Sequence, residues 1–532
     1  MANYEPGRRT YELDRRALLK SLGMTLGAAA FGAPLLASCS SSSSSSGAAS
    51  PAASASAGTP VHGGSASLAI LDNPVNMDPA DGELYSSLEV YQNIFSELLQ
   101  VDANFVYQPN LATSWTQEDP QTWTFDLVDN AVFQNGEPFT AADVAYTISR
   151  MKTHPLGAYL QFFGAVDVLG PHKCRIHLTK PYGPMEATMA SLVDITNQKA
   201  IESTNPQLNP IGCGPYKMEK WVQGSYVTLS RWDKYFKPGR PYLDQATFRS
   251  VADDTVRLTG LQTGQFDWIQ AVPPQQIPQL EKSATLQHTN PGPYLPYLIV
   301  LNTTAPPFND VRVRQAVSWA VDREEIVKLA FFGSAVAATE AISRPNPFYS
   351  GVNPYSGGPD LDKAKSLMSQ AGQKNVSVTF VAEAEVPQYT AMAEVLQSQL
   401  SQIGIQVHIQ TVSSAAWFDT LVAHKYGISA TYFSASLDPA LTYYLLGFST
   451  SGFNLTGLKS AQLDSLLEQF TFQADQATRH QVYPEVVRAF AEQAPFIFMA
   501  NQYQQYWTIP QLHGAEVLPS LEIRLEDMWL SK

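Results

Sequence analysis

Few residues in this sequence have the type and spacing that catalysis requires. The nearest two of the nine histidines, His172 and His177, lie on a predicted strand and the turn before it, which is typical of solvated side chains. Adjacent carboxylates occur at Asp253-Asp254 and at Glu383 and Glu385, at predicted helix starts or strand ends. A helix cap or an exposed face explains such carboxylates without an acid and base role. We therefore expect no catalytic residues.

The common motifs of enzyme active sites are also missing. The sequence contains no Gly-x-Ser-x-Gly turn, no His-Glu-x-x-His pair, no phosphate-binding glycine loop followed by Lys-Ser/Thr and no dinucleotide fingerprint. Its cysteines and histidines have no spacing typical of zinc sites. These absences favour a protein that is not an enzyme and that needs no metal or cofactor, with a hydrolase as the weaker alternative.

The residue types instead indicate binding of a small ligand. Aromatic and small polar side chains lie at the predicted ends of strands, and mostly apolar pockets with a few polar groups are how proteins hold small molecules. For any one of these residues, packing in the core or at its rim is an equal alternative. As a group they predict a ligand site formed by Asn73, Met77, Tyr85, Trp417, Tyr432, Phe433, Ser434, Ala435, Ser436 and Asp438.

The second half of the chain predicts a repeating pattern of strands and helices that would position this site. Apolar residues alternate over 376–380 and 405–409, and between them lies a helical face that ends at Gly404. Such a βαβ unit has parallel strands and a right-handed crossover. A further helix and a strand at 428–432 continue the pattern. Because ligands of open parallel sheets bind beyond the carboxyl ends of the strands, we expect 433–438 at the site.

The first half predicts a similar sheet with an insertion. A strand is expected at 68–70 and a helix at 87–99. Residues 109–204 then change character, with half-exposed strands and a helix capped by Thr140, which indicates an extra small domain. Further strands are expected at 226–229 and 246–250.

The chain is expected to pass between two domains at two places. A short apolar strand at 297–301 leads into a new helical layer, in which Asp310 and Asp322 are expected to cap successive helices. A strand at 496–499 is expected to return the chain. The two crossings are therefore predicted near residues 301–304 and 494–496.

Length and composition narrow the class of protein. At 532 residues the chain exceeds one ordinary core, so two or three domains are expected. A hydrophobic share of 44% and an aromatic share of 11% indicate a well-packed protein. The formal net charge of −14 excludes a basic surface for nucleic acid, which leaves small solutes and proteins as partners.

The N-terminus is predicted to be an export and anchoring signal. Residues 14–20 resemble a twin-arginine export motif, and the apolar stretch 22–36 is too short and too rich in Gly and Ala for a membrane span. Cys39 follows small residues as in a lipoprotein processing site, where the cysteine carries the lipid. The Ser, Ala and Gly residues after it are expected to act as a flexible tether.

Two further cysteines, Cys174 and Cys213, lie in the body of the chain. Extracytoplasmic chemistry permits a disulfide between them, but the sequence does not show whether their Cα atoms come within bridging distance. Two unpaired buried thiols are the favoured interpretation.

The run 306–327, PPFNDVRVRQAVSWAVDREEIV, resembles the signature of the extracellular solute-binding proteins of family 5, the peptide, nickel and related binding subunits of ABC importers. Other blocks that match the family in order are NLATSW at 110–115, FQNGEPFTAADVAYTISR at 133–150, NPIGCGPYKMEKW at 209–221, YLDQATFR at 242–249, LDKAKSLMSQAG at 361–372 and QAPFIFM at 493–499. The resemblance covers nearly everything after residue 65.

This resemblance implies an α/β protein with the type II periplasmic-binding-protein fold, two α/β lobes around a cleft and an extra small domain inserted in lobe one. The expected parts are a twin-arginine-like lipoprotein signal peptide at 1–39, a Ser/Ala/Gly tether at 40–63, lobe I from 64–108, 205–302 and 495–532, the inserted domain at 109–204 and lobe II at 303–494.

The resemblance also implies a function. We expect a monomeric, lipid-anchored subunit on the extracytoplasmic face of the cell membrane, in the periplasmic or cell-wall space. It would capture a peptide-like or other polar solute between its lobes and deliver it to an ABC permease with ATPase subunits. A nickel or metal-chelate importer subunit is the alternative, and a surface lipoprotein without a transport role is a weaker one.

One position of the family pattern is missing from this chain. In peptide-binding relatives an aspartate a few residues before a proline pairs with the free amino group of the peptide. Counting back from Pro439 places Ala435 or a neighbour there. Asp438 could substitute, but Asp followed by Pro is also typical of a helix cap and a first-turn proline, and we favour the cap.

Overall fold

The computed structural model describes residues 58–81, 85–289, 292–433, 437–520 and 522–531. These residues belong to one compact unit, Ala57–Lys532. The predicted signal peptide, its lipid-bearing Cys39 and most of the tether lie outside the described residues, as do Ser434, Ala435 and Ser436. None of the helices in the described ranges is both long and apolar enough to cross a membrane.

The first large sheet has seven strands in the order β12-β19-β11-β1-β10-β9-β8. Its central strand β1 pairs in parallel with β10 and β11, and the outer pairs are antiparallel. We call the part built on this sheet lobe I. Its strands are β1 Ser65–Ile70, β8 Tyr216–Val222, β9 Tyr226–Arg231, β10 Gln245–Ser250, β11 Trp268–Gln270, β12 Gln287–Thr289 and β19 Tyr506–Thr508.

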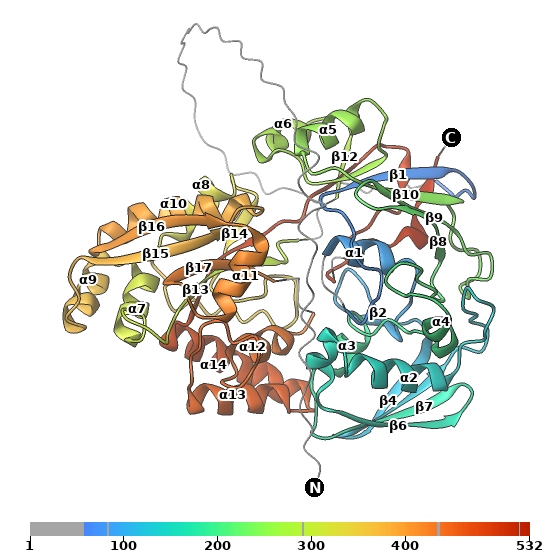
Figure 1. Ribbon diagram of the computed structural model, residues 1–532, viewed down its shortest axis with the longest axis horizontal. Helices are drawn as coiled ribbons and strands as arrows, with labels where there is room; N and C mark the ends of the chain where they lie inside the picture. Colours follow the sequence, from blue (N-terminus) through green and yellow to red (C-terminus); the bar gives the residue numbers. More distant parts are fainter. Residues whose placement is uncertain (1–57, 82–84, 290–291, 434–436, 521, 532) are drawn as a thin grey trace, which may run out of the picture. The chain divides into compact units, whose positions relative to one another are not determined.

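The second large sheet, in lobe II, has six strands in the order β14-β18-β13-β17-β15-β16. The predicted βαβ unit is confirmed, because β15 pairs in parallel with β16 over its whole length and helix α10 connects them (Figure 1). The strands are β13 Leu295–Leu301, β14 Ala335–Ala337, β15 Val376–Glu383, β16 Ile405–Val412, β17 Ile428–Tyr432 and β18 Phe496–Gln502.

A third, antiparallel sheet of four strands lies within the segment predicted as an insertion, in the order β4-β5-β7-β6. Helix α2 packs on it and begins at the predicted cap, where the Asp143 carboxylate accepts a 2.9 Å hydrogen bond from the Thr140 N–H. The bounds 109–204 of the small domain stay a prediction. These strands are β4 Ala112–Asp119, β5 Thr122–Leu127, β6 Phe163–Gly170 and β7 Lys173–Leu178, and two short pairs complete the set, β2 Leu99–Val101 with β3 Tyr107–Pro109 and β20 Leu512–His513 with β21 Trp529–Leu530.

The sheet pairing corrects the predicted crossings. Strands β13 and β18 were expected to belong to lobe I, yet they pair with each other in the sheet of lobe II. Every residue of β13 is buried, so this strand needs a neighbour on both edges, and β17 supplies the second. The chain therefore passes between the lobes in the segments joining β12 to β13 and β18 to β19.

The helices follow local capping signals closely. Asp310 and Asp322 cap α7 and α8 as predicted, and Asp322 accepts a 3.0 Å hydrogen bond from the Glu325 N–H. Among the described residues the Glu325 side chain does not accept from the Asp322 N–H, as a complete capping box requires. The Asp322 N–H donates to the Gln399 side chain instead. The helix expected at 87–99 is shorter, since α1 ends at Tyr91 and the chain continues in turns.

The α-helices are α1 Tyr85–Tyr91, α2 Ala141–Met151, α3 Met185–Met189, α4 Gln198–Ser203, α5 Asp254–Gln262, α6 Ile277–Leu280, α7 Val311–Ala320, α8 Arg323–Ala330, α9 Leu361–Gln370, α10 Pro387–Ser401, α11 Ser414–Val422, α12 Pro439–Gly447, α13 Ala461–Thr471 and α14 Gln476–Gln493. Short 3-10 turns are η1 Pro155–Leu160, η2 Pro274–Gln276 and η3 Leu525–Asp527.

Candidate ligand-binding site

The lobe I side of the predicted site is built where β1 ends and α1 begins. Tyr85, the first residue of α1, has its hydroxyl 3.3 Å from that of Tyr506 on β19 and 3.4 Å from Gln504 Oε1. Tyr506 also donates to the Gln504 side chain. Asp72 lies two residues beyond β1 and keeps exposed surface, although the protein around its carboxylate is dense enough to desolvate it in part. This edge of lobe I therefore presents the partly exposed Tyr85 phenol and the Asp72 carboxylate, with the buried Tyr506 behind Tyr85.

The lobe II side is an aromatic cluster at the end of β17. The ring of Tyr432 lies 5.3 Å from that of Tyr297 on β13 and 6.3 Å from that of Tyr389 on α10. The Tyr389 hydroxyl accepts a 3.0 Å hydrogen bond from the Tyr432 N–H, and Trp417 Nε1 donates to Ser429 Oγ at 3.0 Å. Tyr432 keeps 38% of its surface exposed, so the cluster reaches solvent.

The two sides lie within electrostatic reach of each other. Burial is the main cause that raises the pKa of Tyr85, and Tyr432 contributes to it from the other lobe. Burial, followed by the charges of Asp72 and Glu383, raises the pKa of Tyr432 to about 12. The structure thus brings together Tyr85 and Tyr432, which the sequence placed in one site. We call Asp72, Tyr85, Glu383 and Tyr432 the interlobe site.

Carboxylates dominate the charge around the interlobe site. Burial raises the pKa of both Asp72 and Glu383. The charge of Asp72 raises the pKa of Glu383 further, and both acids raise the pKa of Tyr432. Glu89 on α1 is 1% exposed, neither of its carboxylate oxygens has a hydrogen-bond partner, and burial and then Asp72 raise its pKa well above the ordinary value. Among the described residues, none of Asp72, Glu89, Glu383 or Glu385 forms an ion pair within 4.0 Å of a cation.

Arg257, the cation that lowers the pKa of Asp72, is already engaged. Its guanidinium donates to the backbone oxygens of Gln270 at 2.7 Å and of Val251 at 2.6 Å. Its charge lowers the pKa of Asp72 less than burial raises it. The interlobe site is therefore a place of uncompensated negative charge bordered by phenol rings.

The cap interpretation of the paired glutamates is confirmed in part. Glu383 accepts from Ser414 Oγ, and Glu385 accepts from the Ser414 N–H at 3.1 Å, at the first residue of α11. Glu383 is half-buried rather than fully exposed, and it faces the interlobe site.

Several predicted residues have structural roles. Met77 has no exposed surface, because it packs in the lobe I core with β1 and α1. Asn73 Oδ1 accepts from the Gly224 N–H at 2.9 Å and holds the turn between β8 and β9. Phe433 packs partly against the core formed by α12, α13 and α14, and its N–H donates to Pro296 O at 3.3 Å.

Asp438 caps α12, as the favoured interpretation predicted. Its Oδ1 accepts from the Ala440 N–H at 2.9 Å. Both carboxylate oxygens also accept from Arg479 at 2.6 Å, and the two side chains are almost fully buried. The use of Asp438 as a substitute amine anchor is therefore not supported, because both oxygens are engaged inside lobe II.

Sequence reasoning missed Tyr297, Tyr389 and Glu89. Tyr297 lies in an apolar run and Tyr389 within a helix, so both resemble ordinary core residues. Glu89 lies on the segment expected as a helix at 87–99, and no feature of the sequence marks it as a site residue. Only the position of the two sheets shows that these side chains border one site.

One cluster in the described residues has metal-ligand geometry. Asp78, Asp81 and His154 each place one ligand atom within 4.8 Å of the others. Arg150 pairs with Asp78, however, and Asp81 accepts from His154 Nδ1 at 2.8 Å, from Asn76 at 2.8 Å and from Gln207 at 3.0 Å. Protein donors satisfy these carboxylates, so the cluster is explained as a structural network.

The two body cysteines are free and buried, which confirms the favoured interpretation. Burial raises the pKa of the Cys174 thiol to about 12 and raises that of Cys213 as well. Neither thiol is a nucleophile at neutral pH.

Comparison with known proteins agrees with this architecture. The chain is 26% identical over 479 residues to the glutathione-binding protein GsiB of Escherichia coli K12, which covers 86% of this chain and 93% of that protein. The solved structure of the periplasmic binding protein DppA from Helicobacter pylori with the peptide STSA has a TM-score of 0.78 at 22% identity, over 89% of this chain and 99% of that one.

A second solved structure, NikZ from Campylobacter jejuni with Ni(L-His), has a TM-score of 0.76 at 22% identity, over 85% of this chain and 96% of that one. These structures share the two-lobed α/β fold. The model of the bacterial extracellular solute-binding proteins, family 5 Middle, matches residues 106–454. This chain therefore belongs to the bacterial extracellular solute-binding proteins of family 5.

Proposed function

We propose that this protein is the substrate-binding subunit of an ABC importer, a monomer that captures a peptide-like or other polar solute between its lobes. Membership of the family supports the transport role. The observation that carries the proposal is the convergence of Asp72 and Tyr85 from lobe I with Glu383 and Tyr432 from lobe II. A solute bound there would contact both lobes and favour their closed arrangement.

The charge of the interlobe site supports a particular class of solute. Several carboxylates lie close to one another, and none has an ion-pair partner among the described residues. The charge of each carboxylate therefore makes ionisation of the others less favourable. A positively charged group would relieve this repulsion, and phenol faces attract cations through their ring quadrupoles. The part of the solute held at this place is therefore an amine or guanidinium rather than a free carboxylate.

The direct test is mass spectrometry of the solute that co-purifies with the native protein. A solute with an amine or guanidinium group is expected. Glu383→Gln and Asp72→Asn should each weaken its binding by roughly tenfold in calorimetry, the value for one lost charged partner. Glu394→Gln, on an exposed turn of α10, is the matched control and should leave affinity unchanged. A bound solute without a cationic group would contradict the solute class and leave the transport role intact.

The alternatives give different results in the same experiment. A nickel or metal-chelate subunit would release metal in proportion to protein. A surface lipoprotein without a transport role would yield no solute and would not respond to Glu383→Gln.

We also propose that a lipid on Cys39 holds the protein on the extracytoplasmic face of the membrane after twin-arginine export. The order of paired arginines, apolar stretch, small residues and cysteine supports this. Cys39→Ala should move the protein from the membrane fraction to the soluble fraction. Retention of this variant in the membrane fraction would contradict the lipid anchor.

A further inference from the structure

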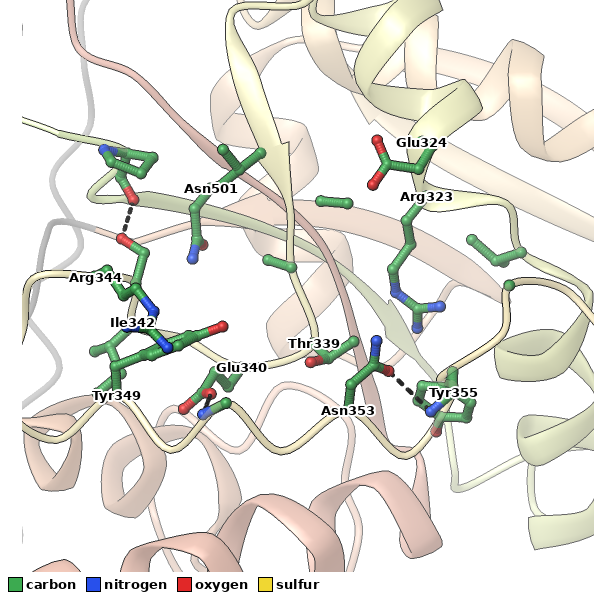
Figure 2. A pocket seen from close by; sticks show the side chains of 18 of the residues that line it. Arg323, Glu324, Thr339, Glu340, Ile342, Arg344, Tyr349, Asn353, Tyr355 and Asn501 are labelled. Atoms are coloured by element: carbon green, nitrogen blue, oxygen red, sulfur yellow. Dashed lines mark hydrogen bonds between the residues drawn. The ribbon is translucent and has the colours of Figure 1, made fainter. Parts of the chain in front are cut away.

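Lobe II contains a cavity of about 530 Å³ that lies apart from the interlobe site. The first turn of α8, the edge strand β14 and the loop after β14 line it, together with Asn501 and Tyr503 at the end of β18 (Figure 2). The interlobe residues Asp72, Tyr85, Glu383 and Tyr432 are not among its lining residues. Its volume is in the range of small-molecule pockets.

Arg323, the first residue of α8, brings a buried charge into this cavity. It is 9% exposed, its Nε donates to Phe498 O at 2.8 Å, and its guanidinium lies 4.7 Å from the centre of the Tyr355 ring. Burial lowers its pKa to about 10, so it stays protonated at neutral pH. Its two Nη atoms donate to no described residue, and no described carboxylate pairs with it.

The other buried arginines show how unusual this is. Each of the other three in the described part of the chain donates an Nη hydrogen bond to a carbonyl or carboxylate. Arg257 does so at 2.6 Å, Arg314 at 2.7 Å and Arg479 at 2.6 Å. Burial of a guanidinium whose Nη atoms have no acceptors destabilises the folded protein, unless a bound anion accepts hydrogen bonds from these atoms.

Asn501 supplies a second group without a partner. It is 2% exposed, its Oδ1 is buried with no hydrogen-bond partner, and its Nδ2 donates to no described residue. Figure 2 shows Asn501 and the Tyr349 hydroxyl on one side of the cavity and Arg323 on the other, with the Arg323 guanidinium toward Asn353 and Tyr355. An amide with both atoms open can accept from and donate to one ligand.

The remaining charges of the cavity limit the ligand. Arg344 lies over the Tyr349 ring at 5.1 Å and adds a second cation. The Asp322 carboxylate caps α8, and Glu340 accepts from Ser350 Oγ at 3.0 Å and the Gly351 N–H at 2.9 Å. The exposed Glu324 carboxylate also lines the cavity, next to Arg323 (Figure 2). Because three carboxylates line the cavity, a singly charged anion is favoured over a doubly charged phosphate.

We propose that this cavity binds a small organic molecule with a carboxylate group, which Arg323 holds as its charged donor, while the Asn501 amide contacts another polar group of the same molecule across the cavity. The planar fork of the guanidinium matches the two oxygens of a carboxylate. This site is separate from the one that captures the transported solute and does not depend on it.

The test uses hippurate, which carries a carboxylate and an amide, and its neutral amide as the matched compound. Calorimetry on the full protein should detect hippurate binding, and the neutral amide should bind at least roughly tenfold more weakly. Arg323→Gln should reduce hippurate affinity by a similar factor. Asn501→Leu, which removes the amide at nearly constant volume, should also weaken binding and serves if Arg323→Gln does not fold.

Two control variants separate this site from other surfaces. Arg488→Gln removes an exposed positive charge on α14, and Tyr432→Ala alters the interlobe site. Both should bind hippurate as the wild type does. Absence of hippurate binding to the wild type, equal binding of its amide, or full binding by the Asn501→Leu and Arg323→Gln proteins would overturn the proposal. Tighter binding of inorganic phosphate than of hippurate would overturn the carboxylate assignment.

Discussion

The buried ion pair of Asp438 and Arg479 has a structural role in lobe II. Asp438 joins the start of α12 to α14, because it accepts from Ala440 and from both Nη atoms of Arg479. Arg479 also donates to Phe470 O at 3.1 Å. The pair therefore ties three helices of lobe II together.

Removal of one partner should destabilise the protein strongly. Asp438→Asn leaves the Arg479 guanidinium buried without a counter-charge, which costs about 3–5 kcal/mol in comparable pairs. Urea unfolding should show a lower midpoint at unchanged slope. Lys173→Met breaks the exposed pair with Asp126 and should cost less than about 1 kcal/mol. Equal stability of the Asp438→Asn and Lys173→Met proteins would show that the buried pair contributes little.

Asp194 makes stability depend on pH. It is 4% exposed, its Oδ1 has no hydrogen-bond partner, and burial with the nearby Glu522 raises its pKa from 3.8 to about 8. The folded state therefore keeps a proton that the unfolded state releases above about pH 4. The contribution of Asp194 to the free energy of unfolding should be greatest below that pH and should fall as the pH rises to about 8.

The change is about 1.4 kcal/mol per pH unit for one full proton, and other buried acids add to it. Asp194→Asn removes the titration and should lose less stability between pH 5 and pH 8 than the wild type does. Asp129→Asn, at an exposed position, should follow the wild-type curve. A parallel pH dependence for the wild type and Asp194→Asn would rule out this assignment.

At the scale of elements, the return of the chain into the lobe I sheet depends on a close approach of backbones. Gly212 and Gly214 pass the end of α1, and the Gly214 N–H donates to Ile94 O at 2.8 Å. A Cβ at Gly212 would lie 2.1 Å from Ile94 O, which is backbone and cannot swing away. These two glycines therefore set the distance between β8 and α1.

Gly212→Ala should separate α1 from β8 and lower stability by about 1–3 kcal/mol, the range for forced overpacking. Gly170→Ala is the control, because nothing lies within 4 Å of a Cβ there and its φ is not positive. Thermal unfolding of both variants measures the difference. If Gly212→Ala unfolds at the wild-type temperature, the backbone contact is not a constraint.

At the scale of the whole molecule, sheet membership identifies where the lobes can move. The sheets place the passages between the lobes after β12 and after β18, and short segments at the ends of elements commonly absorb the backbone changes of hinge closure. A solute bound at the proposed interlobe site would contact both lobes, so its binding energy would favour the arrangement in which they are close.

The radius of gyration from solution scattering should therefore fall when the solute saturates the protein. Tyr432→Ala should reduce the affinity and shift this change to higher solute concentration. The Arg488→Gln protein should close as the wild type does. An unchanged radius with solute demonstrably bound would contradict closure about these connections.

Much of the fold was predictable from sequence because its signals are local. The caps of α7, α8 and α12 depend on an aspartate and the next few residues, and the βαβ unit of β15, α10 and β16 depends on periodicity within one continuous stretch. The motif at 306–327 predicted membership of the family, and the match of the family model over residues 106–454 confirms this prediction. For the site, the sequence placed Tyr85 and Tyr432 together.

Only the tertiary structure decided which sheet a strand joins and which charges remain unpaired. The apolar run at β13 looks the same in either lobe, and its pairing with β17 and β18 is a choice among strands distant in sequence. Arg257 and Arg323 are equally charged in the sequence, yet among the described residues the fold gives carbonyl acceptors to an Nη atom of Arg257 and only to the Nε atom of Arg323. Hydrogen bonds and Coulomb interactions act over a few ångströms, so their balance exists only once distant segments meet.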